Sequence, residues 1–149
     1  MNNSENATAT ATVAEPAAHW TFSVLHAARV IEERMEAALG NVSLSMAKQG
    51  ALTELVAAGE PLTLSQLAAR LSCVRSNMTQ LVDRLEADGL VKRLDDPSDR
   101  RSVRAELTAL GRERQHAGAR AVARVQSEFA AGLSRDDRSA LEAALSTVK

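Results

Sequence analysis

Residues 62–111 read LTLSQLAARLSCVRSNMTQLVDRLEADGLVKRLDDPSDRRSVRAELTALG, and this stretch decides the fold. Thr63 followed by Gln66 forms a capping box, in which each side chain satisfies a free backbone N–H at a helix start, so a short helix is predicted over 64–71. Beyond a short turn, an apolar stripe with helical spacing ends at Gly89; its members are Met78, Leu81, Val82 and Leu85. Two short helices separated by a tight turn indicate a helix-turn-helix.

The period changes after the second of these helices. Val103, Ala105 and Leu107 alternate with polar residues, which is the two-residue repeat of a half-buried strand. Residues 91–94 can pair with this strand across the turn-forming segment 95–99. A β-hairpin that directly follows a helix-turn-helix is a wing, so the sequence predicts a winged helix.

Helical patterns lie on both sides of this segment. A first helix is predicted over residues 17–39, with Gly40 in the left-handed position just past its end. A second helix is predicted to open at Ser43 and to stop at Gly59 and Pro61. After the hairpin, two further helices are predicted to start at the N-cap residues Thr108 and Ser134, the latter completed by Asp137.

The predicted fold class is therefore mainly α, with a small sheet (α+β). We expect a winged helix-turn-helix DNA-binding domain at 43–111. The N- and C-terminal helices of the chain, at 17–42 and 112–149, are expected to form a dimerisation region, because their apolar faces exceed what one small domain can cover. Residues 1–16 carry too little apolar surface to offset the entropy of ordering and are predicted to be a disordered tail.

Composition sets the broad class of protein. The chain has 149 residues, 45% hydrophobic and 25% charged, with a net charge of −1, and only 2% of its residues are aromatic. One Cys excludes an internal disulfide framework, and no apolar stretch approaches the length of a membrane span, so a cytoplasmic protein is expected. Basic residues concentrate in 61–112, which holds nine of them against seven acidic ones. A nucleic-acid footprint is a local property, so the overall charge does not exclude one.

The second helix of a helix-turn-helix enters the major groove, the only groove in which all four base pairs differ. The exposed N-terminal half of this helix offers short polar side chains that can contact bases or phosphates: Arg75, Ser76, Asn77, Thr79 and Gln80. For Ser76 and Asn77 the alternative is that they only start the helix.

The predicted hairpin offers a second contact. Arg101 at its tip can enter the minor groove, where the negative potential attracts a guanidinium, and the carboxylate of Asp99 can hold that guanidinium in a fixed direction. Four further basic residues are expected near phosphates: Lys92, Arg93, Arg100 and Arg104. From charge alone, a solvated loop is an equally good interpretation.

Residues 62–111 resemble the winged helix of the MarR family of bacterial transcriptional regulators. The resemblance rests on LTLSQLAARL, on QLVDRLEADGLV and on the wing DPSDRRSV running into ELT, and the flanking helices extend it to residues 17–149. It implies a homodimer that binds a pseudo-palindromic operator, more often as a repressor than as an activator, and that is released by a small, often phenolic, ligand.

The resemblance also assigns roles to single residues. Ser76, Asn77, Thr79 and Gln80 match base-facing positions of the family's recognition helix, and Asp99 and Arg101 match its wing pair. The chain departs from the family where Ser98 replaces a frequent Arg, where Val74 replaces the usual Ser cap and where Gln80 replaces a frequent Arg. Each departure removes a phosphate contact or a cap that the family pattern would supply.

The only thiol, Cys73, falls in the helix-turn-helix turn. It is expected to pack as a small hydrophobe. The alternative is a redox-responsive regulator, in which oxidation of an exposed Cys73 would misplace the recognition helix and release DNA. No metal site is predicted, because His19 and His26 stand about 10 Å apart along a helix and His116 is isolated.

An effector would need an apolar cleft with a few convergent polar groups. The resemblance places that cleft between the dimerising helices and the winged helix, where the candidate ligand-binding residues are Trp20, His26, Arg29 and Arg70. Each also has a structural interpretation, as a core, interface or ion-paired side chain.

Two other function classes fit the sequence less well. No phosphate-binding glycine loop, Gly-x-Ser-x-Gly motif or recognisable carboxylate pair argues for an enzyme, and no cofactor is expected. A winged helix used only for protein contacts would lack polar readers and the wing arginine, and both are present. The sequence therefore predicts a sequence-specific DNA-binding transcriptional regulator whose partners are double-stranded DNA, a second copy of the chain and a small effector.

Overall fold

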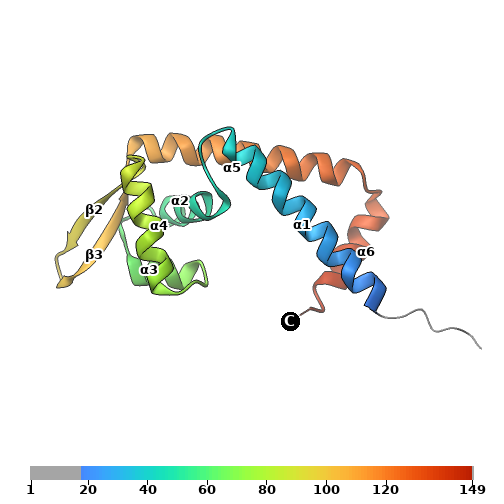
Figure 1. Ribbon diagram of the computed structural model, residues 1–149, viewed down its shortest axis with the longest axis horizontal. Helices are drawn as coiled ribbons and strands as arrows, with labels where there is room; N and C mark the ends of the chain where they lie inside the picture. The colour runs from blue at the N-terminus through green and yellow to red at the C-terminus, as the bar shows by residue number, and fades with distance from the viewer. Residues whose placement is uncertain (1–17, 149) are drawn as a thin grey trace, which may run out of the picture.

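The computed structural model describes residues 18–148, and the predicted tail at 1–16 lies outside them. Within this range the chain forms six helices and one three-stranded sheet (Figure 1). In chain order the elements are α1 (Ala18–Gly40), α2 (Met46–Ala58), β1 (Leu62–Thr63), α3 (Leu64–Arg70), α4 (Arg75–Ala87), β2 (Val91–Asp96), β3 (Asp99–Leu107), α5 (Ala109–Ala131) and α6 (Arg135–Leu145).

The predicted starts of α3, α5 and α6 are confirmed by the side chains that cap these helices. Thr63 Oγ1 accepts a hydrogen bond from the Gln66 backbone N–H at 3.1 Å, and Gln66 Oε1 accepts one from the Thr63 N–H at 2.9 Å, which completes the capping box of α3. Thr108 caps α5 with its side chain alone, where Oγ1 accepts from the Gly111 N–H at 2.9 Å, and Ser134 and Asp137 form a second capping box at α6. Capping is a contact between near neighbours in sequence, so the sequence is enough to locate it.

The predicted junction between the first two helices is wrong by a few residues. Gly40 is the last helical residue of α1 rather than a left-handed residue beyond it, and the left-handed conformation falls on Ser43, with φ 59°. The second helix starts after Ser45, whose side chain accepts from the Lys48 N–H at 3.3 Å. The chain turns between the helices through the Val42 and Ser43 N–H groups, each bonded at 3.0 Å to a carbonyl near the end of α1.

The sheet holds the predicted wing and one strand that was not predicted. Its order is β1-β3-β2 and both pairings are antiparallel, with Val91 opposite Leu107 and Arg93 opposite Ala105 in the hairpin. Strand β1 pairs Leu62 with Ala105 and extends over two residues only. A strand of that length cannot show an alternating pattern in the sequence, which is why the pattern missed it.

Most of the core lies inside the winged helix, and Leu39 of α1 joins it. Met78, Val82 and Leu85 are fully buried on one face of α4, where they pack with Leu52 of α2 and Leu67 of α3. Each such side chain contributes about 1.5–3 kcal/mol through the apolar surface it removes from water. Because this face of α4 fixes the helix against the core, the opposite face is left to solvent.

Helix α5 leaves the winged helix and extends away from it; α1 packs against α5 and slopes away from it toward its own N-terminus (Figure 1). At the far end, α6 has no buried residue. Several large apolar side chains of α1, α5 and α6 are exposed, among them Trp20, Phe22, Leu25, Phe129, Leu141 and Leu145. None of the helices within 18–148 combines the length and the apolar character that crossing a membrane requires.

The winged helix meets the helical half of the molecule, which consists of α1, α5 and α6, where α2 crosses α5. The buried side chain of Gln49 donates from Nε2 to the Gln115 carbonyl at 3.2 Å, and Gln115 Nε2 donates to Thr53 Oγ1 at 3.3 Å. Gly118 permits this approach, because a Cβ at that position would lie 2.1 Å from Gln49 Oε1 and 2.9 Å from a methyl group of Leu44. The junction is therefore close-packed, and Gly118 has a steric reason to be glycine.

Candidate nucleic-acid interface

Helix α4 presents an open N-terminus to solvent. Its N-cap residue, Val74, is extended and makes no side-chain capping hydrogen bond, as expected where Val replaces Ser. Ser76, Asn77, Thr79 and Gln80 are exposed on the part of the helix that follows. The side chain of Arg75 lies outside the described ones. Because the opposite face of α4 is buried, these polar side chains occupy the surface through which a recognition helix would contact base edges.

Two of the predicted readers, Asn77 and Gln80, also line a cavity of about 400 Å³ between α2 and α4. The apolar part of its wall includes Met46, Leu71 and Leu81, and the half-buried Cys73 lies in the same wall. The sequence had placed Cys73 in the turn, but its position beside two predicted DNA readers comes from the packing of α2 against α4.

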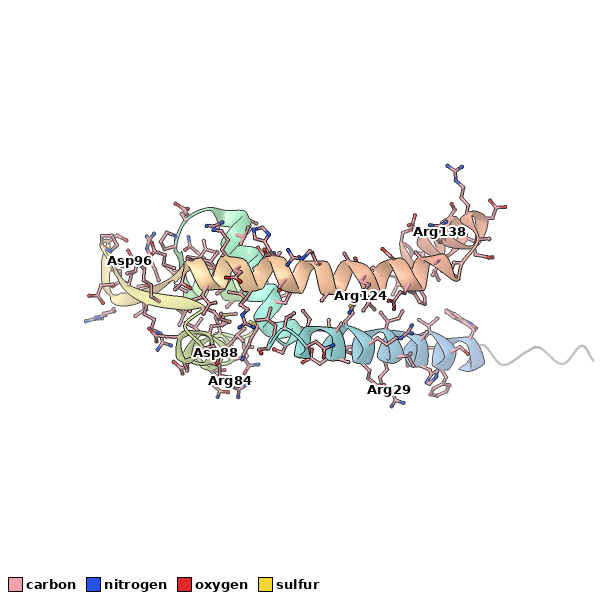
Figure 2. All side chains as sticks on the ribbon, turned by 90° about the horizontal axis from the view of Figure 1, so that it is seen from above. Arg29, Arg84, Asp88, Asp96, Arg124 and Arg138 are labelled. Carbon is pink, nitrogen blue, oxygen red and sulfur yellow. The ribbon has the colours of Figure 1, made fainter. Side chains whose placement is uncertain are left out.

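The wing turn is built around the buried carboxylate of Asp96 (Figure 2). Its Oδ1 accepts hydrogen bonds from Ser98 Oγ at 2.7 Å, from the Ser98 N–H at 3.0 Å and from Arg104 Nη2 at 3.2 Å. These contacts lower the pKa of Asp96 from 3.8 to about 2; the largest effect is the hydrogen bond from the Ser98 hydroxyl, followed by that from the Ser98 N–H and by Arg104. Ser98 therefore has a structural role at a position where the family resemblance led us to expect Arg.

The Asp99 and Arg101 pair is arranged differently from the expectation. Arg101 is exposed at the wing, as predicted. However, Asp99 Oδ1 accepts a hydrogen bond from the Arg101 backbone N–H at 2.9 Å. This carboxylate therefore holds the backbone of Arg101 rather than its guanidinium. Bonding of Asp to the N–H two residues later is a local turn interaction. Asp99 thus shapes the turn that presents Arg101.

Three of the basic residues expected near phosphates have carboxylate partners within the protein. Lys92 Nζ pairs with the carboxylate of Glu106, and Arg104 Nη2 pairs with Asp96. Arg93 pairs with Asp83 through Nη2 and with Glu86 through Nη1, the latter at 3.3 Å. A phosphate at any of these positions would compete with a carboxylate. The side chain of Arg100 lies outside the described ones.

The two acidic residues of α4 that hold Arg93 were not predicted from the sequence. Asp83 and Glu86 stand three residues apart, a spacing that puts both side chains on one helix face. That spacing was a usable signal, but only the packing of α4 beside β2 shows that Arg93 is their partner.

Within one chain, the four candidate ligand residues are not brought together. Trp20 is 62% exposed near the start of α1, and Arg29 pairs with Glu33 on the same helix and points away from α5 (Figure 2). Arg70 pairs with Glu54 of α2 at 3.4 Å. His26 lines a cavity of about 290 Å³ between α1 and α5.

Comparison with known proteins agrees with this arrangement of helix-turn-helix and hairpin. The model of the MarR family matches residues 44–103. The transcriptional repressor CouR, solved bound to a 23-mer DNA duplex, is 31% identical; the match covers 86% of this chain and 90% of that chain, with a TM-score of 0.75. The chain belongs to the MarR family. This MarR-family regulator therefore has the winged-helix fold that its sequence predicts.

Two further matches differ in identity and in the share of each chain that they cover. The HTH-type transcriptional regulator YkoM of Bacillus subtilis (strain 168) is 43% identical over 63 residues, which cover 42% of this chain and 41% of that relative. The chain thus spans less than half the length of YkoM. The organohalide-sensing regulator RdhR, solved in its 2,4-dichlorophenol-bound form, is 21% identical, with 99% of this chain and 88% of that chain covered and a TM-score of 0.79. At that identity the likeness shows a shared fold.

Proposed function

We propose that this MarR-family regulator binds a pseudo-palindromic operator as a homodimer. Helix α4 of each protomer would enter the major groove, and the wing would place Arg101 at the adjacent minor groove. The observation that carries the proposal is the exposure of both contact surfaces at the same end of the molecule, with α4 beside the β2–β3 hairpin (Figure 1). The DNA-bound structure of the relative CouR supports it.

The proposed dimer rests on the exposed apolar side chains of α1, α5 and α6. Trp20 is 62% exposed, Phe22 70% and Leu145 47%, all on the half that lies away from the winged helix. Large apolar side chains left exposed on one part of a molecule mark a candidate association site. A second copy of the chain would cover it on both protomers at once, because a two-fold interface uses the same patch twice.

Regulation by a small ligand is the finer part of the proposal. A repressor that a phenolic molecule releases would need a cleft between the dimerising helices and the winged helix. Because Trp20, His26, Arg29 and Arg70 are not brought together within one chain, such a cleft would have to be completed by the second protomer. The fold accommodates a phenol in at least one case, the chlorophenol-bound RdhR.

Redox response through Cys73 is the second candidate. It is favoured by the position of this half-buried thiol in the cavity wall shared with Asn77 and Gln80. Oxidation to a sulfenic acid would add a polar oxygen beside Leu71 and Leu81 and displace the start of α4. Loss of DNA binding on peroxide treatment, absent in Cys73→Ser, would support this candidate over the ligand; equal peroxide sensitivity of both proteins would exclude it.

Operator binding can be tested with DNA that the protein itself selects. The purified protein selects duplexes from a random-sequence library, and fluorescence anisotropy then measures affinity for the selected duplex and for random DNA at two salt concentrations. We expect tighter binding to the selected duplex, a steep fall with salt and a loss in Arg101→Ala. A library without enrichment, or equal affinity for both duplexes, would contradict the proposal.

A further inference from the structure

Arg93 joins the recognition helix to the wing. Its guanidinium lies between two carboxylates of α4, with Nη2 on Asp83 Oδ1 and Nη1 at 3.3 Å from Glu86 Oε2. The Arg93 backbone N–H also donates to the second oxygen of Glu86, Oε1, at 3.2 Å. Each oxygen of Glu86 therefore has an Arg93 donor, and three contacts link one residue of β2 to one face of α4.

The place of Arg93 in the sheet explains the backbone contact. Strand β2 is an edge strand, because the strand order is β1-β3-β2, and Arg93 stands opposite Ala105 of β3. An edge strand has N–H groups that no neighbouring strand can accept, and such groups need another partner. Glu86 supplies that partner, so α4 is attached to the free edge of the wing.

We infer that Arg93 is a positioning residue that fixes the wing relative to the recognition helix and neutralises the acidic face of that helix, rather than a phosphate contact. This inference rests on the proposed DNA-binding function. Two separate elements, α4 and the tip carrying Arg101, must meet two grooves of one duplex, so their relative position has to be held. Holding both reading elements in place reduces the ordering cost at the moment of binding.

The charges support the second part of the inference. Asp83 and Glu86 have side chains that are 52% and 41% exposed, on the helix that is proposed to enter a groove lined by phosphates. Without Arg93, two carboxylates would face the like charge of the DNA. Like-charge contacts at an interface lower affinity. The side chain of Arg93 is only 31% exposed and already has two anionic partners, which leaves it poorly placed to bind a third.

A double-mutant cycle tests the inference. Arg93→Ala is made in the wild type and in the Asp83→Asn/Glu86→Gln background, and each protein is titrated with the selected duplex and with random DNA over a range of salt. We expect Arg93→Ala to weaken binding to the selected duplex about tenfold in the wild type, because two partly exposed ion pairs are lost. In the carboxamide background we expect a loss under about twofold, because no carboxylate is left for Arg93 to hold or to neutralise.

Three controls make the result specific. Lys92→Ala removes a neighbouring cation of β2 that pairs with Glu106 instead, and it should show no dependence on the carboxamide background. Arg93→Lys keeps the positive charge, but an ammonium group lacks the planar geometry with which a guanidinium binds two carboxylates. Compared with Arg93→Ala, it should therefore restore the affinity for random DNA more fully than it restores the ratio of selected to random affinity. Thermal unfolding of every variant, without DNA, verifies that the chains compared are folded.

Each outcome has one meaning. An equal loss from Arg93→Ala in both backgrounds, together with a salt dependence reduced by about one counterion, would show a phosphate contact and overturn the inference. No loss in either background would also overturn it. A wild type that binds the selected and random duplexes equally would instead defeat the proposed function, on which the inference depends.

Discussion

The winged helix and the helical half of this regulator differ in how far their apolar and charged side chains find partners within the chain. In the winged helix, apolar groups such as Met78 and Val82 are fully buried, and charged groups such as Arg93 and Arg104 have carboxylate partners within the chain. In the helical half, Trp20 and Leu145 are exposed, and α6 has no buried residue. The difference supports the proposal that a second copy of the chain covers the helical half, whereas the winged helix is packed within one chain.

The largest effect is expected from disrupting the proposed dimer surface of the helical half. Leu141→Asp combined with Leu145→Asp places two charges on the apolar face of α6, which should prevent the dimer and cost about 10²–10⁴-fold in operator affinity, because two linked half-sites become independent ones. Sedimentation velocity checks the mass. Ser139→Asp, on the other side of α6, is the matched control and should stay dimeric. A dimeric double variant would show that α6 is not in the interface.

The next largest effect is expected from the wing of the winged helix. Arg101→Ala should weaken operator binding about 100-fold, because a dimer loses two guanidinium contacts of about 1–2 kcal/mol each. The unfolding temperature should not change, since Arg101 is exposed. Fluorescence anisotropy gives the affinity, and Arg29→Ala, an exposed arginine of the helical half, serves as the control. Equal affinities of the two variants would remove the wing from the interface.

A smaller effect is expected from the recognition helix. Asn77→Ala should cost about 1–3 kcal/mol on the operator and relax the base preference at one position in each half-site. Anisotropy with duplexes substituted one base pair at a time measures this. If the variant loses as much on random DNA as on the operator, Asn77 contacts phosphate only.

The junction between the two halves can be tested by stability alone. In Gly118→Ala, the methyl group would meet Gln49 Oε1 at 2.1 Å, and the resulting overpacking outweighs the gain in helix propensity, so the free energy of unfolding should fall by about 1 kcal/mol. In Gly40→Ala, nothing lies within 4 Å and the same free energy should rise by about 0.5–1 kcal/mol. Urea denaturation compares the pair. Equal changes would show that α2 and α5 do not pack closely.

The smallest effect concerns the wing turn and pH. Because the pKa of Asp96 is lowered from 3.8 to about 2, its ionised form stabilises the turn fully above pH 4, and this stabilisation is lost as the pH falls toward 2. The NMR signal of the Ser98 amide should shift over that window, and the shift should disappear in Asp96→Asn. A Ser98 amide that titrates in Asp96→Asn as well would assign the change to another group.

How far the sequence predicts this molecule depends on how local each feature is. The capping box of Thr63 and Gln66, the apolar face of α4 and the hairpin all follow from residues close in sequence, and they were predicted correctly. The end of α1 was misplaced because the turn through Ser43, rather than Gly40, takes the left-handed conformation.

The candidate site was less predictable, because its contacts cross between elements. Arg93 looks like a phosphate contact when only its charge and its place in the hairpin are known. Its partners Asp83 and Glu86 become visible only once α4 and β2 are packed together. Asp99 was expected to hold a guanidinium, whereas the turn geometry brings the nearer backbone N–H of Arg101 to it.

The most direct test of a dimeric winged-helix regulator is the arrangement of half-sites in the selected DNA, together with the number of chains bound to it. The selected library is sequenced, and the complex with the most enriched duplex is weighed by sedimentation equilibrium. We expect two inverted half-sites with centres about 10 base pairs apart, or a multiple of that, and two chains per duplex. A single unrepeated half-site bound by one chain would contradict a dimeric winged-helix regulator.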